Sequence, residues 1–283
     1  MTGKIISILL VIFILFLSGC TQSSQSSRGG SNGLIIESFG PVTNEVEPGD
    51  STDIIAVIKN AGGSEVSNIQ VELYGLGDWK PNLITPPNSN MLPGDPKRGI
   101  EPETSEVVWE VTAPSYKTGI ESQEFEIRVY YSYSTSAVAQ IKVASDSYIK
   151  SFPASEQQSK ISELGVKMDK YTDGPISVSV SAPSKVVRAG STSVRITIDI
   201  QNVGGGNLVN YELPISISSP GRSVNCGVSN TIKLLQGKSK QIRCTVDANL
   251  GGGWDNIPIQ VELQNYRYWV SATSTISALP REI

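Results

Sequence analysis

Histidine is absent from this chain of 283 residues. Its absence excludes a Ser-His-Asp catalytic triad, a histidine-ligated zinc ion and a pH switch based on histidine. The chain also has no Asn-x-Ser/Thr sequon, so standard N-glycosylation is not expected. No run of lysine and arginine is interleaved with aromatic residues. We therefore expect no nucleic-acid partner.

Long apolar runs are also missing, except near the N-terminus. The segment from Ile5 to Leu17 is apolar apart from Ser7, and Lys4 places a positive charge before it. This run is as long as the hydrophobic region of a signal peptide, and it is shorter than the roughly 20 residues of a membrane-spanning helix. We expect residues 1–19 to be a signal peptide for export.

The residues that close this run resemble the lipobox of prokaryotic lipoproteins. Ser18 and Gly19 are small, and they directly precede Cys20. The resemblance implies cleavage before Cys20, a diacylglyceryl group on its thiol, and attachment to the extracellular face of the cell membrane. Two acyl chains anchor a protein stably, whereas one does so only marginally. The alternatives are an uncleaved anchor and a cysteine that happens to follow a signal peptide.

Residues 20–33 follow as a segment rich in serine, glycine and glutamine. After Cys20 it has no apolar side chain to bury, so it cannot offset the entropy lost on ordering. We predict that residues 20–33 are a flexible, lipid-anchored tether.

Strong helical periodicity is scarce in the remainder of the chain, where apolar and polar residues alternate. Such alternation, interrupted by many turn-forming residues, is typical of an all-β protein. Residues 47–63 and 188–205 share one pattern: a glycine turn, an alternating strand and the motif Asn-x-Gly-Gly. The side chains expected to be buried in the two copies are Ile54, Ala56 and Ile58, and Ile196, Ile198 and Ile200.

The repeat continues further along the chain. Trp109 stands where Cys244 stands in the second copy, and Tyr-x-Tyr at 131–133 returns at 266–268. Each Tyr-x-Tyr is followed by a predicted last strand, at 137–143 and 270–276. The chain is long enough for two such domains.

These features together resemble the CARDB-type immunoglobulin-like domains of archaeal and bacterial cell-surface and S-layer-associated proteins. The resemblance implies two tandem immunoglobulin-like β-sandwiches, at 34–147 and 175–283, used for display, spacing or adhesion. The second copy lacks the Ala-Pro that ends one strand of the first, and carries cysteines instead. Residues 148–174 would join the two sandwiches.

The two predicted sandwiches differ in charge. Residues 34–147 contain 17 acidic and 7 basic residues, a net charge of −10, and residues 175–283 contain 6 acidic and 10 basic residues, a net charge of +4. Because their charges are opposite, we expect the two halves to attract each other or to attract different partners. The alternative is two ordinary solvated surfaces.

Cysteine is rare, and its three occurrences leave Cys226 and Cys244 after Cys20 is assigned to the lipobox. An even remainder in an exported chain favours a disulfide, which would contribute roughly 3 kcal/mol. Two free buried thiols and a redox-active pair are the alternatives. No Cys-x-x-Cys motif supports the redox pair.

The predicted connector, residues 148–174, contains the clearest helical signal. Ile161, Leu164 and Met168 recur at i, i+3 and i+7, which predicts a short amphipathic helix that Ser155 could cap. Gly165 weakens this prediction. The helix would be a spacer docked on a sandwich or, alternatively, a site that binds a partner.

Motifs of enzymes occur only in the wrong arrangement. Ser147 and Lys150 match Ser-x-x-Lys, and residues 117–119 match the Lys-Thr-Gly of penicillin-binding enzymes. Their order is reversed, no Ser-Asp-Asn lies between them, and we expect Ser147 at the end of a strand. Acidic side chains near loops lack EF-hand spacing, so solvated charge is preferred over calcium binding. These acidic residues are Asp50, Asp53, Asp78, Asp95, Glu101 and Glu103.

Residues 75–99 form a long segment rich in proline and other turn-forming residues. Long loops are often functional, so we predict that Trp79 and its neighbours form a contact surface for a partner. The alternative is a loop packed over the edge of the sandwich.

The sequence therefore predicts a non-enzymatic lipoprotein that acts as a structural, display or interaction module. Its expected partners are the membrane, through the lipid on Cys20, and an unidentified protein or envelope component. We assign no catalytic residue, metal, cofactor or small-molecule substrate. The alternative is an accessory subunit of a membrane or envelope assembly, docked through its immunoglobulin-like domains.

Overall fold

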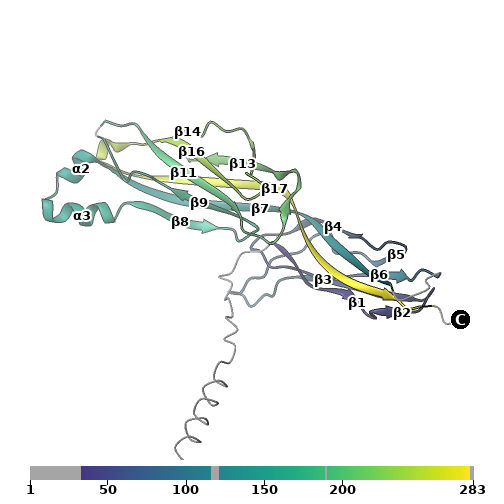
Figure 1. The fold of residues 1–283 in the computed structure, drawn as a ribbon. Helices are drawn as coiled ribbons and strands as arrows, with labels where there is room; N and C mark the ends of the chain where they lie inside the picture. The colour runs from purple at the N-terminus through teal and green to yellow at the C-terminus, as the bar shows by residue number, and fades with distance from the viewer. Residues whose placement is uncertain (1–32, 116–120, 189, 281–283) are drawn as a thin grey trace, which may run out of the picture.

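The computed structural model describes residues 33–115, 121–188 and 190–280. The predicted signal peptide, Cys20 and the tether up to residue 32 lie outside the described residues. The described chain is almost entirely β-structure, which confirms the all-β prediction. It forms two lobes, each built from sheets that pack around a buried apolar core (Figure 1).

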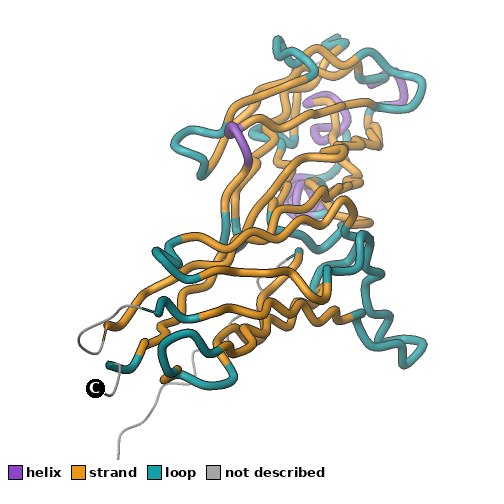
Figure 2. The backbone as a smooth tube through the Cα atoms, turned by 90° about the vertical axis from the view of Figure 1, so that its right-hand side faces the viewer, coloured by secondary structure: helices purple, strands orange, loops and turns teal. Residues whose placement is uncertain are grey.

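Two very long strands run through both lobes. β7 (Glu121–Ser145) and β17 (Trp254–Ala278) are each 25 residues long and pair antiparallel along nearly their whole length, from Trp254 opposite Ala144 to Ala278 opposite Glu121. Their register shifts between Leu263 and Tyr266. In Figure 1 the yellow strand β17 bends where it passes from one lobe to the other, and Figure 2 shows the two lobes from the side. We call this junction of the lobes the waist.

Lobe 1 contains the strands before β7, the first half of β7 and the second half of β17. One of its sheets has the order β1-β3-β6-β5, and the other pairs β4 with β7 and β2 with the end of β17. The strands before β7 are β1 (Leu34–Pro41), β2 (Glu45–Val46), β3 (Ser51–Asn60), β4 (Ser67–Tyr74), β5 (Lys80–Thr85) and β6 (Thr104–Thr112).

Lobe 2 contains the second half of β7, the first half of β17 and the strands between them. One sheet has the order β14-β16-β11-β9, and the other places β8 and β10 on β7, and β13 beside β17. The strands between β7 and β17 are β8 (Gly165–Tyr171), β9 (Ile176–Ser181), β10 (Val186–Val187), β11 (Ser193–Asn202), β12 (Asn207–Leu208), β13 (Glu212–Ser218), β14 (Val224–Asn225), β15 (Thr231–Lys233) and β16 (Ser239–Asp247).

The repeat is visible in the register of its strands. Ile54 of β3 pairs with Trp109 of β6, and Ile196 of β11 pairs with Cys244 of β16. All four side chains are buried. The alternating residues predicted to form the cores are therefore placed correctly, and Trp109 and Cys244 are equivalent positions.

The prediction of a separate last strand in each copy is wrong. β7 passes through residues 131–137 without interruption, and residues 137–143 extend the same strand into lobe 2. The segment alternates buried Tyr131, Tyr133 and Thr135 with serines and contains no glycine, proline or asparagine. The two-residue periodicity of a strand therefore continues through this segment, and no turn forms.

The sequential division at 34–147 and 175–283 therefore needs correction. Residues 135–145 of the first range pair within lobe 2, and residues 266–278 of the second range pair within lobe 1. Each predicted half thus supplies one strand to the other lobe.

The predicted connector is structured and belongs to lobe 2. It contributes the helices α2 (Asp146–Lys150) and α3 (Ala154–Ser162), and then β8 pairs with β7. The predicted helix exists but ends earlier, so Met168 lies in β8, and Pro153 rather than Ser155 is the N-cap residue. Gly165 is the first residue of β8 and has φ +139°, a conformation that favours glycine.

Candidate interaction surfaces

The described chain enters the fold at the waist. A Cβ atom added to Gly33 would lie 2.8 Å from the Tyr131 hydroxyl oxygen and 3.0 Å from Pro175 Cδ. Leu34 then begins β1, paired with Asn60. Because Pro175 precedes β9 of lobe 2 and Asn60 ends β3 of lobe 1, Gly33 lies where the two lobes meet.

Four buried tyrosines join the lobes at this point. Tyr131 and Tyr133 come from β7, and Tyr266 and Tyr268 come from β17. The ring centroids of Tyr131 and Tyr268 are 5.7 Å apart, and those of Tyr133 and Tyr266 are 6.0 Å apart. The Tyr-x-Tyr repeat therefore forms one shared cluster instead of two separate cores.

Each Asn-x-Gly-Gly turn is fastened in the same way. The Asn60 side-chain amide donates to the carbonyl of Ser64, and that of Asn202 donates to the carbonyl of Gly206. The backbone N–H of Ser64 then donates to the Tyr133 hydroxyl at 3.0 Å, and the N–H of Gly206 donates to Tyr268 at 3.1 Å. In each copy the second tyrosine of the Tyr-x-Tyr motif thus holds the Asn-x-Gly-Gly turn of the same copy.

Burial disfavours ionisation of these phenols. It raises the pKa of Tyr133 and of Tyr268 to about 12, against the hydrogen bonds that they accept. It also raises the pKa of Tyr131 and of Tyr266. The cluster is therefore neutral at physiological pH and links the lobes through aromatic contacts and hydrogen bonds.

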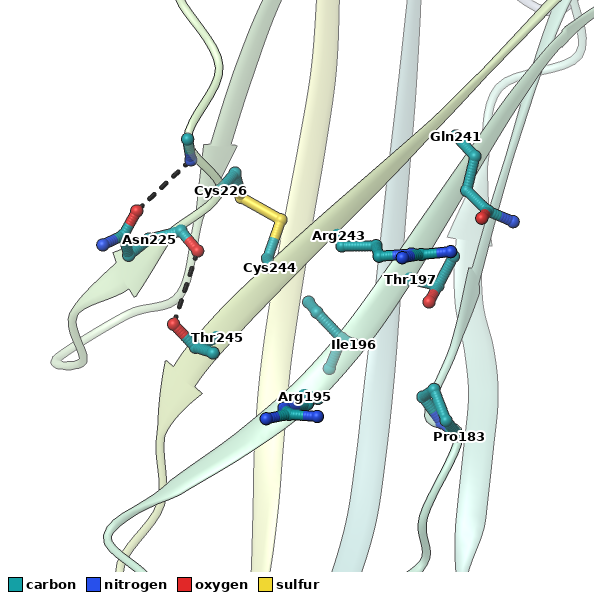
Figure 3. A pocket seen from close by; sticks show the side chains of 11 residues that line it. Pro183, Arg195, Ile196, Thr197, Asn225, Cys226, Gln241, Arg243, Cys244 and Thr245 are labelled. Carbon is teal, nitrogen blue, oxygen red and sulfur yellow. Dashed lines mark hydrogen bonds between the residues drawn. A yellow bond between two sulfur atoms is a disulfide. The ribbon is translucent and has the colours of Figure 1, made fainter.

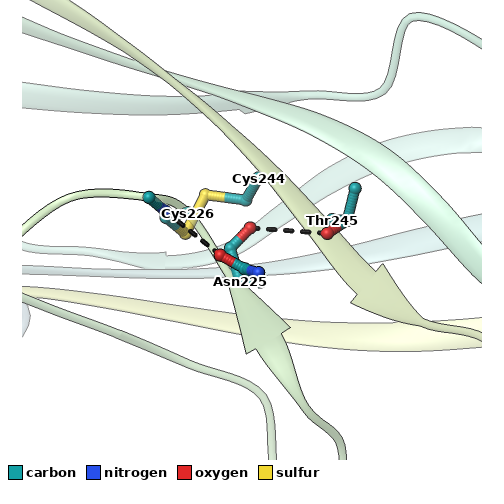
Figure 4. Close-up of a disulfide and its surroundings, with 5 residues drawn as sticks. Asn225, Cys226, Cys244 and Thr245 are labelled. Carbon is teal, nitrogen blue, oxygen red and sulfur yellow. Dashed lines mark hydrogen bonds between the residues drawn. A yellow bond between two sulfur atoms is a disulfide. The ribbon is translucent and has the colours of Figure 1, made fainter.

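The predicted disulfide between Cys226 and Cys244 is confirmed (Figure 4). It joins the end of edge strand β14 to β16, next to the pair formed by Asn225 and Thr245. Cys244 is buried and Cys226 is half-buried. The disulfide fills the core position that an indole fills in lobe 1.

The outer face of the β11–β16 pair carries an open groove of about 650 Å³. Pro183 borders it on one side, and residues 225–227 border it on the other. Arg195 and Arg243 lie on this face together with Thr197 and Gln241 (Figure 3). Both arginines are exposed, and neither forms an ion pair with any described residue.

The equivalent face of lobe 1 carries the opposite charge. Asp53 pairs directly with Glu110 across β3 and β6, and Glu106 lies on the same face. All three are exposed, and within the described chain none of them forms a salt bridge. Like charges opposite each other are unfavourable in a sheet. Asp53 and Glu110 are such a pair.

The sequence prediction for Trp79 is wrong, because this side chain is only 6% exposed and belongs to the core. It cannot form a contact surface. Residues 80–85 of the same segment form edge strand β5. We did not predict this strand, because Pro81 is unfavourable in strands other than edge strands. The charged faces were missed as well, although the opposite net charges of the two halves are a coarse signal of them.

The enzyme-like motif is also placed differently. Ser147 lies in the first turn of α2, not at the end of a strand, and Lys150 lies in the last turn of that helix. The Lys150 amine pairs with Asp146 at 2.5 Å. Lys117 lies outside the described residues.

The described residues contain no group of three or more Cys, Asp or Glu side chains placed to hold a metal ion. In the same part of the chain, no helix is long and apolar enough to cross a membrane.

No family model and no curated protein matches this chain. Solved structures give weak similarities. A protein of unknown function from Porphyromonas gingivalis W83 has a TM-score of 0.23 and 14% identity, covering 76% of this chain and 84% of that one. The secreted serine protease VesC from Vibrio cholerae has a TM-score of 0.22 and 11% identity, covering 86% and 50%. The collagen adhesin of S. aureus has a TM-score of 0.13 and 12% identity, covering 86% and 91%. At these scores, the similarities carry no argument about function.

Proposed function

We propose that this protein is a non-enzymatic lipoprotein of the extracellular face of the cell membrane, where its two β-lobes act as an interaction module. A lipid on Cys20 would hold it to the membrane. The observation that carries the proposal is the disulfide between Cys226 and Cys244 in a chain that begins with a lipobox-like signal. Disulfides persist in oxidising compartments outside the cytosol.

The lobes offer broad sheet faces rather than an enclosed site. The groove on lobe 2 is open to solvent, and its charged residues are two arginines that form no ion pair with a described carboxylate. Such a surface suits recognition of another macromolecule better than turnover of a small substrate. The surface-lipoprotein resemblance of the sequence supports the same role.

Lipidation is tested with the full chain in a bacterium that processes lipoproteins. Mature wild-type protein should carry the mass of a diacylglyceryl group and partition into the detergent phase, whereas Cys20→Ala should do neither. Thr21→Ala is the matched control and should behave as wild type. Equal masses and equal partitioning of the wild type and Cys20→Ala, apart from the substitution, would contradict the proposal.

Location and partner are tested on cells. Protease added to spheroplasts should digest the protein while they remain intact. Cross-linking on intact cells should then capture the lobes with protein or envelope components. A single dominant membrane-protein partner would instead support the accessory-subunit alternative.

A further inference from the structure

The outer face of the β3–β6 pair in lobe 1 and that of the β11–β16 pair in lobe 2 are equivalent. The first is mainly acidic, and the second carries two arginines. The pairing of Ser51 with Thr112 in lobe 1 has the same register as that of Ser193 with Asp247 in lobe 2. Asp53 is therefore equivalent to Arg195. By the same registers Glu106 is equivalent to Gln241 and Glu110 to Thr245, so the acidic face of lobe 1 and the arginine-bearing groove of lobe 2 occupy equivalent positions in the two sheets. Each face also carries a charge of the other sign, Lys59 in lobe 1 and Asp199 in lobe 2.

Neither face is covered by another helix or strand of the described chain. Both faces lie on the solvent side of their strands, because the alternate residues of these strands form the buried cores. They belong to different sheets, β1-β3-β6-β5 and β14-β16-β11-β9. A partner could therefore reach each face independently.

The acidic face also has an apolar centre. Ile55, Val57 and Val108 lie between its carboxylates and are half-buried, so part of each side chain remains exposed. An apolar centre with a charged rim is typical of protein interfaces. The lobe 2 positions equivalent to Ile55 and Val108 are Thr197 and Arg243, which line the open groove.

The geometry points to a second copy of this chain as the partner of both faces: the lobe 1 face of one molecule docks against the lobe 2 groove of the next. Asp53, Glu106 and Glu110 would face Arg195 and Arg243. The inference rests on the proposed interaction module and names its partner. Because the two surfaces differ, the contact is heterologous, and its repetition gives a ring or an open chain of molecules.

Reversal of charge on one face at a time tests the contact. Asp53→Lys/Glu110→Lys gives two basic faces, and Arg195→Glu/Arg243→Glu gives two acidic faces. Each variant alone should fail to self-associate. A mixture of the two should associate, because the basic groove of the first then meets the acidic face of the second.

The measurement uses full-length protein with two different tags in uncharged detergent, by co-purification and light scattering. Wild-type association should weaken about tenfold or more between about 30 and 500 mM NaCl, because salt screens exposed charges. Lys150→Glu/Lys167→Glu lies away from both faces, lowers the net charge as much as Arg195→Glu/Arg243→Glu does, and should associate as wild type does. Thermal unfolding verifies that all variants are folded.

A monomeric wild type at low salt would overturn the inference, as would variants that associate alone or a mixture that does not associate. These outcomes do not depend on the lipid. Failure of the Cys20→Ala experiment would contradict the anchor and leave this result intact, and failure here would leave the anchor intact.

Discussion

Trp109 and Cys244 fill the same core position in the two lobes. Trp109 lies opposite Ile54, and Cys244 lies opposite Ile196 in the same register. An indole therefore packs in lobe 1 where a disulfide to Cys226 packs in lobe 2. The same arrangement of strands therefore accommodates either an indole or a disulfide. Lobe 2 has a covalent link at this position that lobe 1 lacks.

Loss of that link should destabilise lobe 2. We expect Cys226→Ala/Cys244→Ala to lower the free energy of unfolding by roughly 3 kcal/mol, because the closed loop spans 18 residues. Denaturant unfolding measures the change. Reductant should destabilise the wild type to a similar extent and leave the double variant unaffected. Equal unfolding of the wild type with and without reductant would contradict the prediction.

The strand exchange predicts which fragments can fold. A fragment of residues 175–283 lacks residues 135–145, which pair with β17 in lobe 2, so it should be unfolded or aggregated. A fragment of residues 135–264 contains the paired strands of lobe 2 and should fold. Dispersion of amide NMR signals distinguishes the two. Folding of 175–283 but not of 135–264 would instead support sequential domains.

High pH should loosen the waist. Tyr133 and Tyr268 have a pKa of about 12 in the folded protein, above the value of about 10 in an unfolded chain. Their contribution to stability is complete below pH 10 and is lost as the pH rises from 10 to 12, because the unfolded state ionises first. Thermal unfolding across this range should show a steep fall in Tm.

Substitution by phenylalanine separates this effect from general alkaline denaturation. Tyr133→Phe/Tyr268→Phe cannot ionise at these positions, so its Tm should fall less steeply between pH 10 and 12. At neutral pH the variant should be less stable by about 1–3 kcal/mol per lost buried hydrogen-bonding group. Tyr211→Phe alters an exposed phenol and is the matched control. Equal slopes in all three proteins would contradict the prediction.

The ion pair of Arg222 and Asp255 should matter at low pH. The Arg222 guanidinium donates to both carboxylate oxygens, at 2.6 and 2.9 Å, and the Asn249 N–H donates at 2.6 Å. Burial opposes ionisation, but these hydrogen bonds outweigh it and lower the pKa of Asp255. The pair therefore stabilises the fold above the ordinary aspartate pKa, and this contribution is lost as the pH falls through the depressed value.

Asp255→Asn should cost roughly 1.5–3 kcal/mol at neutral pH, because it removes charge-assisted hydrogen bonds from the half-buried Arg222 guanidinium. The variant should also lose less stability than the wild type on acidification. Asp146→Asn breaks the exposed pair with Lys150 and should cost less than about 1 kcal/mol. Denaturant unfolding at pH 7 and pH 3 measures both effects, and a similar cost for the two variants would count against this reading.

Local pattern predicted much of the fold. The alternation of apolar and polar residues around Ile54 and Ile196 predicted the buried faces of β3 and β11. The even number of cysteines that remain after Cys20 predicted the disulfide. The path of β7 was not predictable in the same way. The alternation of buried and exposed residues is the same whether two strands are separated by a turn or one strand continues into a second lobe. Only the pairing of distant residues, such as Tyr131 with Tyr268, decides this.

The candidate surfaces were harder to predict than the fold. Trp79 was assigned to a surface because its segment is rich in proline. Burial of the large apolar indole is favourable, however, and the composition of the loop does not show that this side chain is buried. The charged faces depend on which carboxylates and arginines align across strands. Asp53 and Glu110 are far apart in the sequence, so the net charge of each half was the available signal.

The position of Gly33 at the junction of the lobes has a mechanical consequence. If the lipid on Cys20 anchors the protein, the load is applied at the centre of the elongated molecule rather than at one tip. The two lobes would then extend to either side of the point of attachment. Force on either lobe would be transmitted to the tether through the tyrosine cluster and the two shared strands.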